Sequence, residues 1–153
     1  GDWSSDVCSS DLDILLATTG ITEDEAHAVF TPEDLMAAQK VLRRMPVGDR
    51  VVDLILDLVR ACRPDEPGAS EAVVKNVSWG PGPRAAQALM LTVRAKALLD
   101  GRLAPSPQDV VEMAEPVLLH RMALTFAARA RGESLGDLIH AVAEQVTHVE
   151  AAA

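Results

Sequence analysis

The segment from Pro83 to about Leu99 constrains the fold more than any other part of the chain. Its Ala- and Leu-rich sequence is apolar around most of the circumference that a helix would present. Pro83 suits the first helical position, where its missing N–H costs nothing, and Asp100-Gly101 favours a left-handed end. A helix that is apolar on most sides must be covered by other elements. We therefore predict that this helix is the centre of a bundle.

The composition favours helices for the covering elements as well. Hydrophobic residues make up 48% of the 153 residues, yet aromatic residues make up only 3% and there is no Tyr. Ala, Leu and Val supply the apolar content, which favours helices over a sheet-rich fold. No segment alternates convincingly enough for a strand, although residues 121–126 are ambiguous. We predict an all-α fold, a bundle of about five to six helices around one core.

Two segments carry the same helix-start chemistry. Thr31-Pro32-Glu33-Asp34 and Ser106-Pro107-Gln108-Asp109 each place a hydroxyl at the N-cap, proline at the first helical position and an acid in the first turn. The first predicts a helix that runs to about Met45 and ends before Pro46. The second predicts a helix that Pro116 should kink or divide.

Periodicity and capping residues predict the other elements. Residues 49–61 repeat apolar side chains at helical spacing, while Asp53 and Asp57 face away as the solvated side. The remaining predictions are a helix tail over residues 13–18 stopped by Gly20, a short turn from Ser70 to Lys75 and a last helix capped by Ser134.

The sequence Trp79-Gly80-Pro81-Gly82-Pro83-Arg84 joins a rigid turn to the central helix. Arg84 falls in the first helical turn, where unpaired N–H groups and the helix dipole already favour negative charge. An arginine at that end either extends into water or completes an anion site. Helix-terminus physics alone gives the two interpretations equal weight.

The usual signatures of self-contained catalysis are missing from the sequence. There is no G-x-x-x-x-G-K-[ST] phosphate loop, no G-x-G-x-x-G after a strand, no H-E-x-x-H and no C-x-x-C. No set of Ser, His and Asp is defined by its spacing. We therefore do not expect this chain to catalyse a reaction by itself.

The other polar residues that invite a functional interpretation favour a structural one. His140, Glu144 and His148 lie four apart on one predicted helical face, but zinc sites normally close with four ligands and no fourth is visible. His120-Arg121 is interpreted as a buried polar anchor. Cys62 is interpreted as a small core residue without a cationic neighbour to activate its thiol. We predict no metal site.

Residues 1–12 are interpreted as a non-native leader. They show neither helical nor strand periodicity, and they lack the basic start and apolar middle of a signal peptide. From Asp2 onward they resemble the translation of a common short-read sequencing adapter. We therefore expect natural sequence to begin near Asp13, with a further part of the protein upstream of it.

Charge and hydropathy exclude several classes of partner. The formal net charge of −9 argues against nucleic acid or an anionic membrane surface as the main partner. No apolar run reaches the roughly 20 residues that a membrane-spanning helix needs. With residues 1–12 set aside, Cys62 is the only cysteine, so we expect a reducing, cytoplasmic setting.

Several short motifs, in order over roughly residues 13–140, resemble the MoxR family of AAA+ ATPases. Trp79-Gly80-Pro81-Gly82-Pro83-Arg84-Ala85 is similar to the sensor-2 motif G-x-S-P-R-A, with Pro81-Gly82 in place of the usual Ala-Ser. The other matches are to R-R-V-P-V at residues 43–47, L-V-x-A-T-R-P at 58–64, A-L-L-x-G-R at 97–102, V-x-P-x-D-V at 105–110 and V-L-x-H-R at 117–121.

The resemblance implies that residues 31–153 are the C-terminal helical lid of an AAA+ ATPase, with residues 13–30 as the tail of the ATPase core and its connection. It implies that Arg84 is the sensor-2 arginine, which contacts the terminal phosphate of ATP, and that Gly82 and Pro83 share the nucleotide site. The phosphate loop and the residues that hold Mg²⁺ would lie upstream. The fragment alone should then neither bind ATP tightly nor hydrolyse it.

The resemblance also implies partners for the parent protein. That protein would bind ATP and Mg²⁺, assemble through its AAA+ core into a homo-oligomeric ring, and remodel or activate client proteins. The alternative is a self-standing acidic helical module that binds a partner helix and has no catalytic activity. The alternative requires a natural start codon near Asp13, whereas the first interpretation requires a continuous upstream frame that encodes a phosphate loop.

Overall fold

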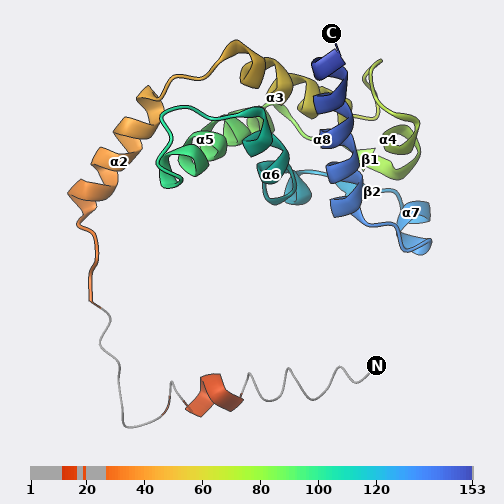
Figure 1. The fold of residues 1–153 in the computed structure, drawn as a ribbon. Helices are drawn as coiled ribbons and strands as arrows, with labels where there is room; N and C mark the ends of the chain where they lie inside the picture. Colours follow the sequence, from red (N-terminus) through yellow and green to blue (C-terminus); the bar gives the residue numbers. More distant parts are fainter. Residues whose placement is uncertain (1–11, 17–18, 20–26, 153) are drawn as a thin grey trace. The chain divides into compact units, whose positions relative to one another are not determined.

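The computed structural model describes residues 12–16, 19 and 27–152 of the chain (Figure 1). It separates into two units, residues 1–35 and residues 36–153. In the first unit residues 12–16 are helical, in agreement with the helix tail expected over residues 13–18. The predicted stop at Gly20 and most of the leader lie outside the described residues.

The helix α2 (Pro32–Arg44) begins at the capping sequence that predicted it. The Thr31 hydroxyl accepts a hydrogen bond from the backbone N–H of Asp34 at 3.1 Å, and the Asp34 carboxylate accepts one from the N–H of Thr31 at 3.0 Å. This reciprocal box satisfies N–H groups that a helix start leaves unpaired. Hydrogen bonds from the Thr31 hydroxyl and N–H hold the pKa of Asp34 below its usual value.

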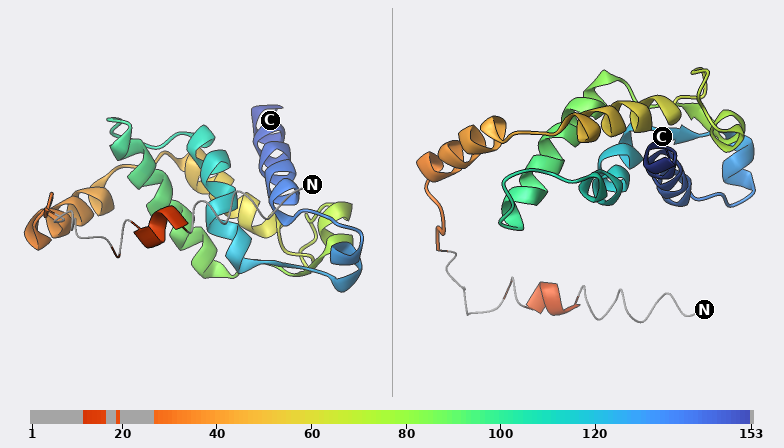
Figure 2. Two further views of the ribbon diagram at one scale, coloured as in Figure 1. Left: turned by 90° about the horizontal axis from the view of Figure 1, so that it is seen from below. Right: turned by 45° about the horizontal axis from the view of Figure 1, so that its top comes forward.

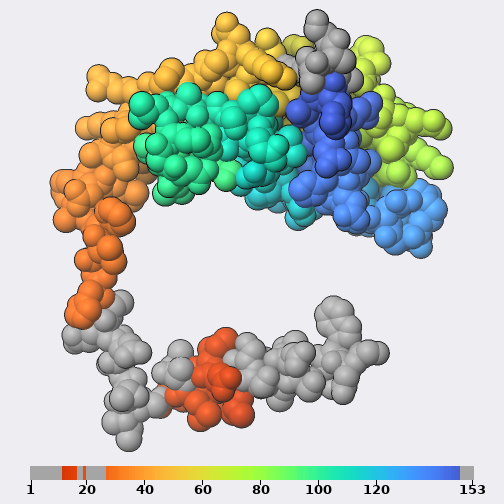
Figure 3. All heavy atoms as spheres, viewed as in Figure 1, coloured from red at the N-terminus to blue at the C-terminus, as the bar shows by residue number. Residues whose placement is uncertain are grey.

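The second unit is a helical bundle, which confirms the predicted all-α fold. The helix α5 (Pro83–Leu99) packs against α3 (Asp49–Ala61) and α6 (Pro107–Leu118), and α8 (Leu135–Ala152) packs against α3 and α6 as well. Figure 2 shows these four helices from two further sides. In the space-filling view α5, α6 and α8 adjoin one another across one face (Figure 3).

The core lies where these four helices meet. Apolar residues at helical spacing form the buried stripe of α5, as expected for an amphipathic helix: Ala85, Leu89, Val93 and Ala97. The helix is less completely covered than its composition predicted, since Leu99 at its end is 88% exposed. On α3 the predicted solvated side is confirmed, because Asp53 and Asp57 are exposed.

Cys62 lies at the end of α3 and is fully buried, which confirms its interpretation as a core residue. Burial raises the pKa of the Cys62 thiol to about 12. The thiol is therefore protonated at neutral pH and is a poor nucleophile, because the thiolate is the reactive form.

Short elements connect the long helices. They are α4 (Glu71–Asn76), the 3-10 turn η1 (Leu119–Arg121), α7 (Phe126–Ala130) and an antiparallel pair of strands, β1 (Val77–Trp79) with β2 (Ala123–Leu124). The predicted caps are confirmed, since the Ser70 hydroxyl accepts the N–H of Val73 at 3.3 Å and the Ser134 hydroxyl accepts the N–H of Asp137 at 3.2 Å. The strand β2 lies in the segment that the sequence left ambiguous.

The predicted division of the helix at Pro116 is wrong, because the proline lies inside one continuous helix. Helix α6 continues through Pro116 to Leu118, and the chain then tightens into η1. None of the helices in the described ranges is long and apolar enough to span a membrane.

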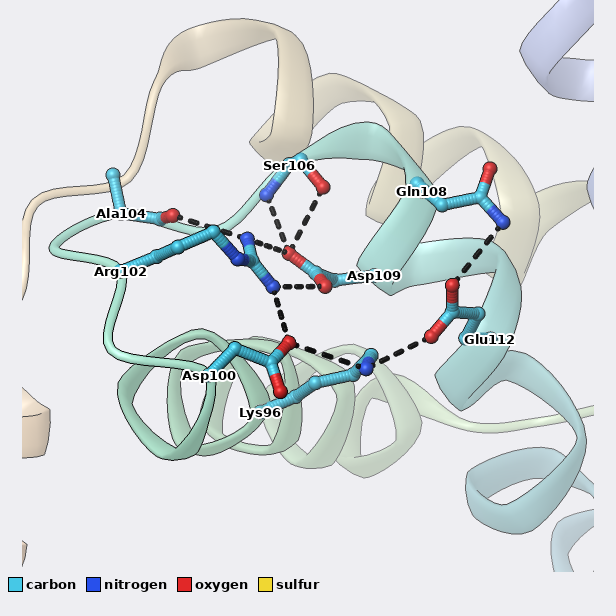
Figure 4. Close-up of polar contacts among 8 residues, drawn as sticks. All are labelled: Lys96, Asp100, Arg102, Ala104, Ser106, Gln108, Asp109 and Glu112. Atoms are coloured by element: carbon cyan, nitrogen blue, oxygen red, sulfur yellow. Dashed lines mark hydrogen bonds and ion pairs between the residues drawn. The ribbon is translucent and has the colours of Figure 1, made fainter.

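The loop between α5 and α6 is held by a network of charged side chains (Figure 4). Gly101 has a φ of 74°, which confirms the predicted left-handed end of α5. The Arg102 guanidinium then donates to both carboxylate oxygens of Asp109, at 2.7 and 2.8 Å. Asp109 also accepts from the backbone N–H of Ser106 at 2.7 Å, in the predicted capping box. Lys96 bridges the network to α6 through Glu112 at 2.9 Å.

Asp109 is the buried member of this network, with only 2% of its surface exposed. Hydrogen bonds from Arg102, followed by those from Ser106, lower the pKa of Asp109 to about 2, although burial opposes the shift. Because an unfolded aspartate titrates near pH 3.9, the pair stabilises the fold at neutral pH. The contribution is present above about pH 4 and is lost as the pH falls through about 2.

Asp109→Asn should therefore lower the free energy of unfolding by about 2 kcal/mol at pH 7. The difference from wild type should shrink as the pH falls toward 2, because protonation then weakens the same pair in the wild type. Urea unfolding of the 153-residue chain at several pH values measures both effects. Glu112→Gln is the matched control: its carboxylate is half-exposed, so its loss should cost less than about 1 kcal/mol. Equal losses for the two variants would contradict the assignment.

Candidate functional site

The turn that precedes α5 is docked against the end of α3. Gly80 approaches the backbone there so closely that a Cβ at this position would lie 2.6 Å from the Cys62 carbonyl oxygen and 2.8 Å from the Arg63 Cα. Pro81 is buried, and its carbonyl accepts a hydrogen bond from Arg63 Nε at 2.8 Å. The turn predicted from its Gly and Pro content is thus also held from outside.

Arg84 leaves this turn as an exposed cation in the first turn of α5. Gly82 is the N-cap and has no side chain to satisfy the free N–H groups, and the first turn holds no acidic residue. The Arg84 side chain forms no hydrogen bond or ion pair with any other residue that the structure describes. The positive end of the helix dipole and the guanidinium therefore both lack a compensating negative charge.

Arg84 lines a shallow depression of about 450 Å³ together with His120 and Arg121. The remaining lining residues are Trp79, Gly82, Pro83 and Ala85. The pairing of β1 with β2 brings the two segments together, because Trp79 lies opposite Ala123, two residues after Arg121. The depression contains basic side chains and no carboxylate, so its chemistry suits an anion such as a phosphate group.

The interpretation of His120-Arg121 as a buried anchor is wrong for His120. The His120 side chain is exposed, because it lies in η1, beyond the last turn of α6 that packs on the core. Arg121 is half-buried and does act as an anchor, since it donates to the Val117 carbonyl at 2.6 Å. The two side chains also contact each other.

His140 contacts a residue outside its own helix. Its Nε2 lies 2.7 Å from Glu115 Oε2 on α6, whereas Glu144 and His148 are exposed further along α8. In the part of the chain that the structure describes, no group of His, Cys, Asp and Glu side chains is arranged to hold a metal ion.

The sequence did not identify Arg63 as part of the site. Its bond to Pro81 joins residues 18 positions apart, at the end of one helix and before the start of another. No local pattern links such positions, although Arg63 lies within the L-V-x-A-T-R-P match.

Gly80→Ala should destabilise the chain by about 2 kcal/mol, since the added methyl group would displace a well-packed backbone. Thermal and urea unfolding of the 153-residue chain measure the loss. Gly82→Ala is the matched control from the same turn: its backbone has a φ of −81° and a Cβ there meets nothing within 4 Å. The control should stay within about 0.5 kcal/mol of wild type. A Gly80→Ala variant as stable as the control would refute the close approach.

Comparison with known proteins shows which family this helical bundle resembles. Residues 69–142 match the family model of the AAA lid domain. The chain is 32% identical over 127 residues to the chaperone MoxR1 of Mycobacterium tuberculosis, an alignment that covers 83% of this chain and 34% of the relative. It is also similar to the crystal structure of a protein from Cytophaga hutchinsonii assigned as an ATPase, with a TM-score of 0.74 and 25% identity.

That structural match covers 88% of this chain and 41% of the Cytophaga protein. The chain thus spans about a third of the curated relative and less than half of the solved one. The helical bundle, the match to the family model and the similarity to two relatives all indicate the same family. The chain contains an AAA+ lid domain of the MoxR type.

Proposed function

We propose that the chain is the lid of a longer ATPase and that Arg84 contacts the terminal phosphate of ATP. The observation that carries this proposal is the exposed guanidinium of Arg84, which lacks a partner among the described residues at the positive end of α5. A phosphate oxygen would supply the missing negative charge through charge-assisted hydrogen bonds. The partial coverage of both relatives supports a core that lies outside this chain.

The residues of the depression fit one part of the nucleotide. Arg84, His120 and Arg121 suit phosphate oxygens, and Gly82 and Pro83 allow them to approach the helix end. The lining offers no carboxylate for Mg²⁺, so we assign the metal to residues of the core. ATP supplies the phosphoanhydride bond that is cleaved, and Arg84 would stabilise the negative charge that gathers on the phosphate.

A phosphate contact made by a lid also links hydrolysis to movement. Loss of the terminal phosphate removes the negative charge that holds Arg84, so the lid can rotate relative to the core. We propose that the parent protein assembles into a homo-oligomeric ring in the cytoplasm and uses this rotation to remodel client proteins. The name of the Mycobacterium relative as a chaperone supports this use. In this proposal residues 31–153 form the lid and residues 13–30 lead into it from the core.

Arg84→Ala in the full-length protein should lower the kcat for ATP hydrolysis by about 100-fold. Arg84→Lys should recover only part of the rate, because an ammonium cannot reproduce the planar fork of a guanidinium. The steady-state ATPase rate measures both. Gln87→Ala is the control, since Gln87 is exposed one turn further along α5 and does not line the depression. All variants should unfold at the wild-type temperature. An Arg84→Ala rate equal to wild type would remove the assigned role.

The 153-residue chain by itself should not hydrolyse ATP. The phosphate loop would belong to the missing core, and a single cationic depression offers too few contacts for tight binding. An ATPase assay and calorimetric titration with ATP and Mg²⁺ test this expectation. Saturable turnover would contradict it. The upstream genomic sequence separates this proposal from a self-standing interaction module: a continuous frame with a phosphate loop supports the ATPase, and a start site near Asp13 supports the module.

A further inference from the structure

We infer that Arg63 is a positioning residue for Arg84. Arg63 holds the turn from Gly80 to Pro83 in place, and this turn determines the direction in which Arg84 leaves the start of α5. The inference rests on the proposed contact between Arg84 and phosphate, and it concerns how this chain prepares that contact.

The Arg63 side chain connects two segments at once. Its Nε donates to the Pro81 carbonyl at 2.8 Å, and its Nη1 donates to Glu66 Oε1 at 3.2 Å. Its own backbone N–H bonds the Arg60 carbonyl at 2.9 Å, beyond the end of α3. The side chain is 29% exposed, so it is largely enclosed between these partners. A guanidinium held on two sides has a defined orientation.

The turn depends on contacts with other segments because its sequence allows few hydrogen bonds within the turn itself. Pro81 and Pro83 have no backbone N–H, so neither can donate a hydrogen bond within the turn. Gly80 and Gly82 have more accessible backbone conformations than other residues, so ordering this turn costs more conformational entropy. The close packing of Gly80 against the end of α3 and the bond from Arg63 to Pro81 supply the missing constraint.

The location of Arg63 makes this arrangement favourable. A cation just beyond the C-terminal end of α3 is stabilised by the exposed carbonyl groups and the negative end of the helix dipole. The end of α3 is therefore a favourable place for the partly buried Arg63 guanidinium. The result is a rigid link between the end of α3 and the start of α5, only three residues before Arg84.

Precise placement matters for a residue that contacts a reacting phosphate. A displacement of about 1 Å, caused by a change away from the reacting atoms, can lower a rate by about 100-fold. Lysine cannot replace Arg63, since its flexible ammonium lacks the Nε–H that reaches Pro81. Both Arg63→Met and Arg63→Lys should therefore release the turn.

Hydrogen exchange in the 153-residue chain tests the link without nucleotide. In Arg63→Met and Arg63→Lys the amide of Ala85, which donates to the Gly82 carbonyl at 2.9 Å, should exchange at least tenfold faster than in wild type, while buried amides of α3 keep their protection. Arg60→Met is the matched control, because Arg60 lies one turn earlier on α3 and, among the described residues, forms an ion pair only with exposed Asp57, at 3.8 Å. Unchanged exchange of the Ala85 amide would overturn the inference. Faster exchange throughout the core would also overturn it, in favour of a general role in stability.

A double-mutant cycle in the full-length protein tests the effect on function. Arg63→Met should lower kcat for ATP by about tenfold or more, and it should cause no further loss when combined with Arg84→Ala. Losses that multiply would show independent roles and overturn the inference. The two proposals fail separately: a normal rate for Arg84→Ala removes the phosphate contact, whereas a slow Arg84→Ala with a normal Arg63→Met removes only the role of Arg63.

Discussion

The close approach of Gly80 to the end of α3 determines the arrangement of the site. It brings the turn against the Cys62 and Arg63 backbone at a distance that no side chain at position 80 would allow. From that contact α5 begins with a fixed direction, and β1 pairs with β2 beside it. That pairing brings the basic residues of η1 to the depression that Arg84 lines. The arrangement of the depression therefore requires that position 80 has no side chain.

The helices followed from local chemistry, whereas the site required contacts between distant segments. The bounds of α3 and α5 were predicted because capping residues and apolar spacing act within a few residues of each other. The free cation of Arg84 was predictable for the same reason, although the choice between solvent and phosphate was not. The strand pair and the bond from Arg63 to Pro81 join segments that no local pattern connects. The exposure of His120 likewise depends on where η1 lies relative to the core.

The cations with structural roles are paired with acidic groups, whereas Arg84, the cation proposed to contact phosphate, is not. At the far end of α5, Arg102 and Lys96 are paired with acidic side chains that fix the loop to α6. Near the turn, Arg63 is paired with Glu66 and a carbonyl. In a chain with a formal net charge of −9, acidic partners are plentiful, yet none lies in the depression. Keeping acids away from Arg84 is as important for anion binding as the arginine itself.

Both ends of α5 are attached to neighbouring helices. The helix has 17 residues, so it is about 25 Å long at the usual rise of 1.5 Å per residue. Its beginning is clamped at the turn, and its end carries the exposed side chain of Leu99 into a loop stiffened by Arg102 and Asp109. A tilt of about 5° at the turn would displace that loop by about 2 Å for a rod of this length. Because α5 also packs against α3 and α6, a change of direction at Arg84 would move these helices together with the loop.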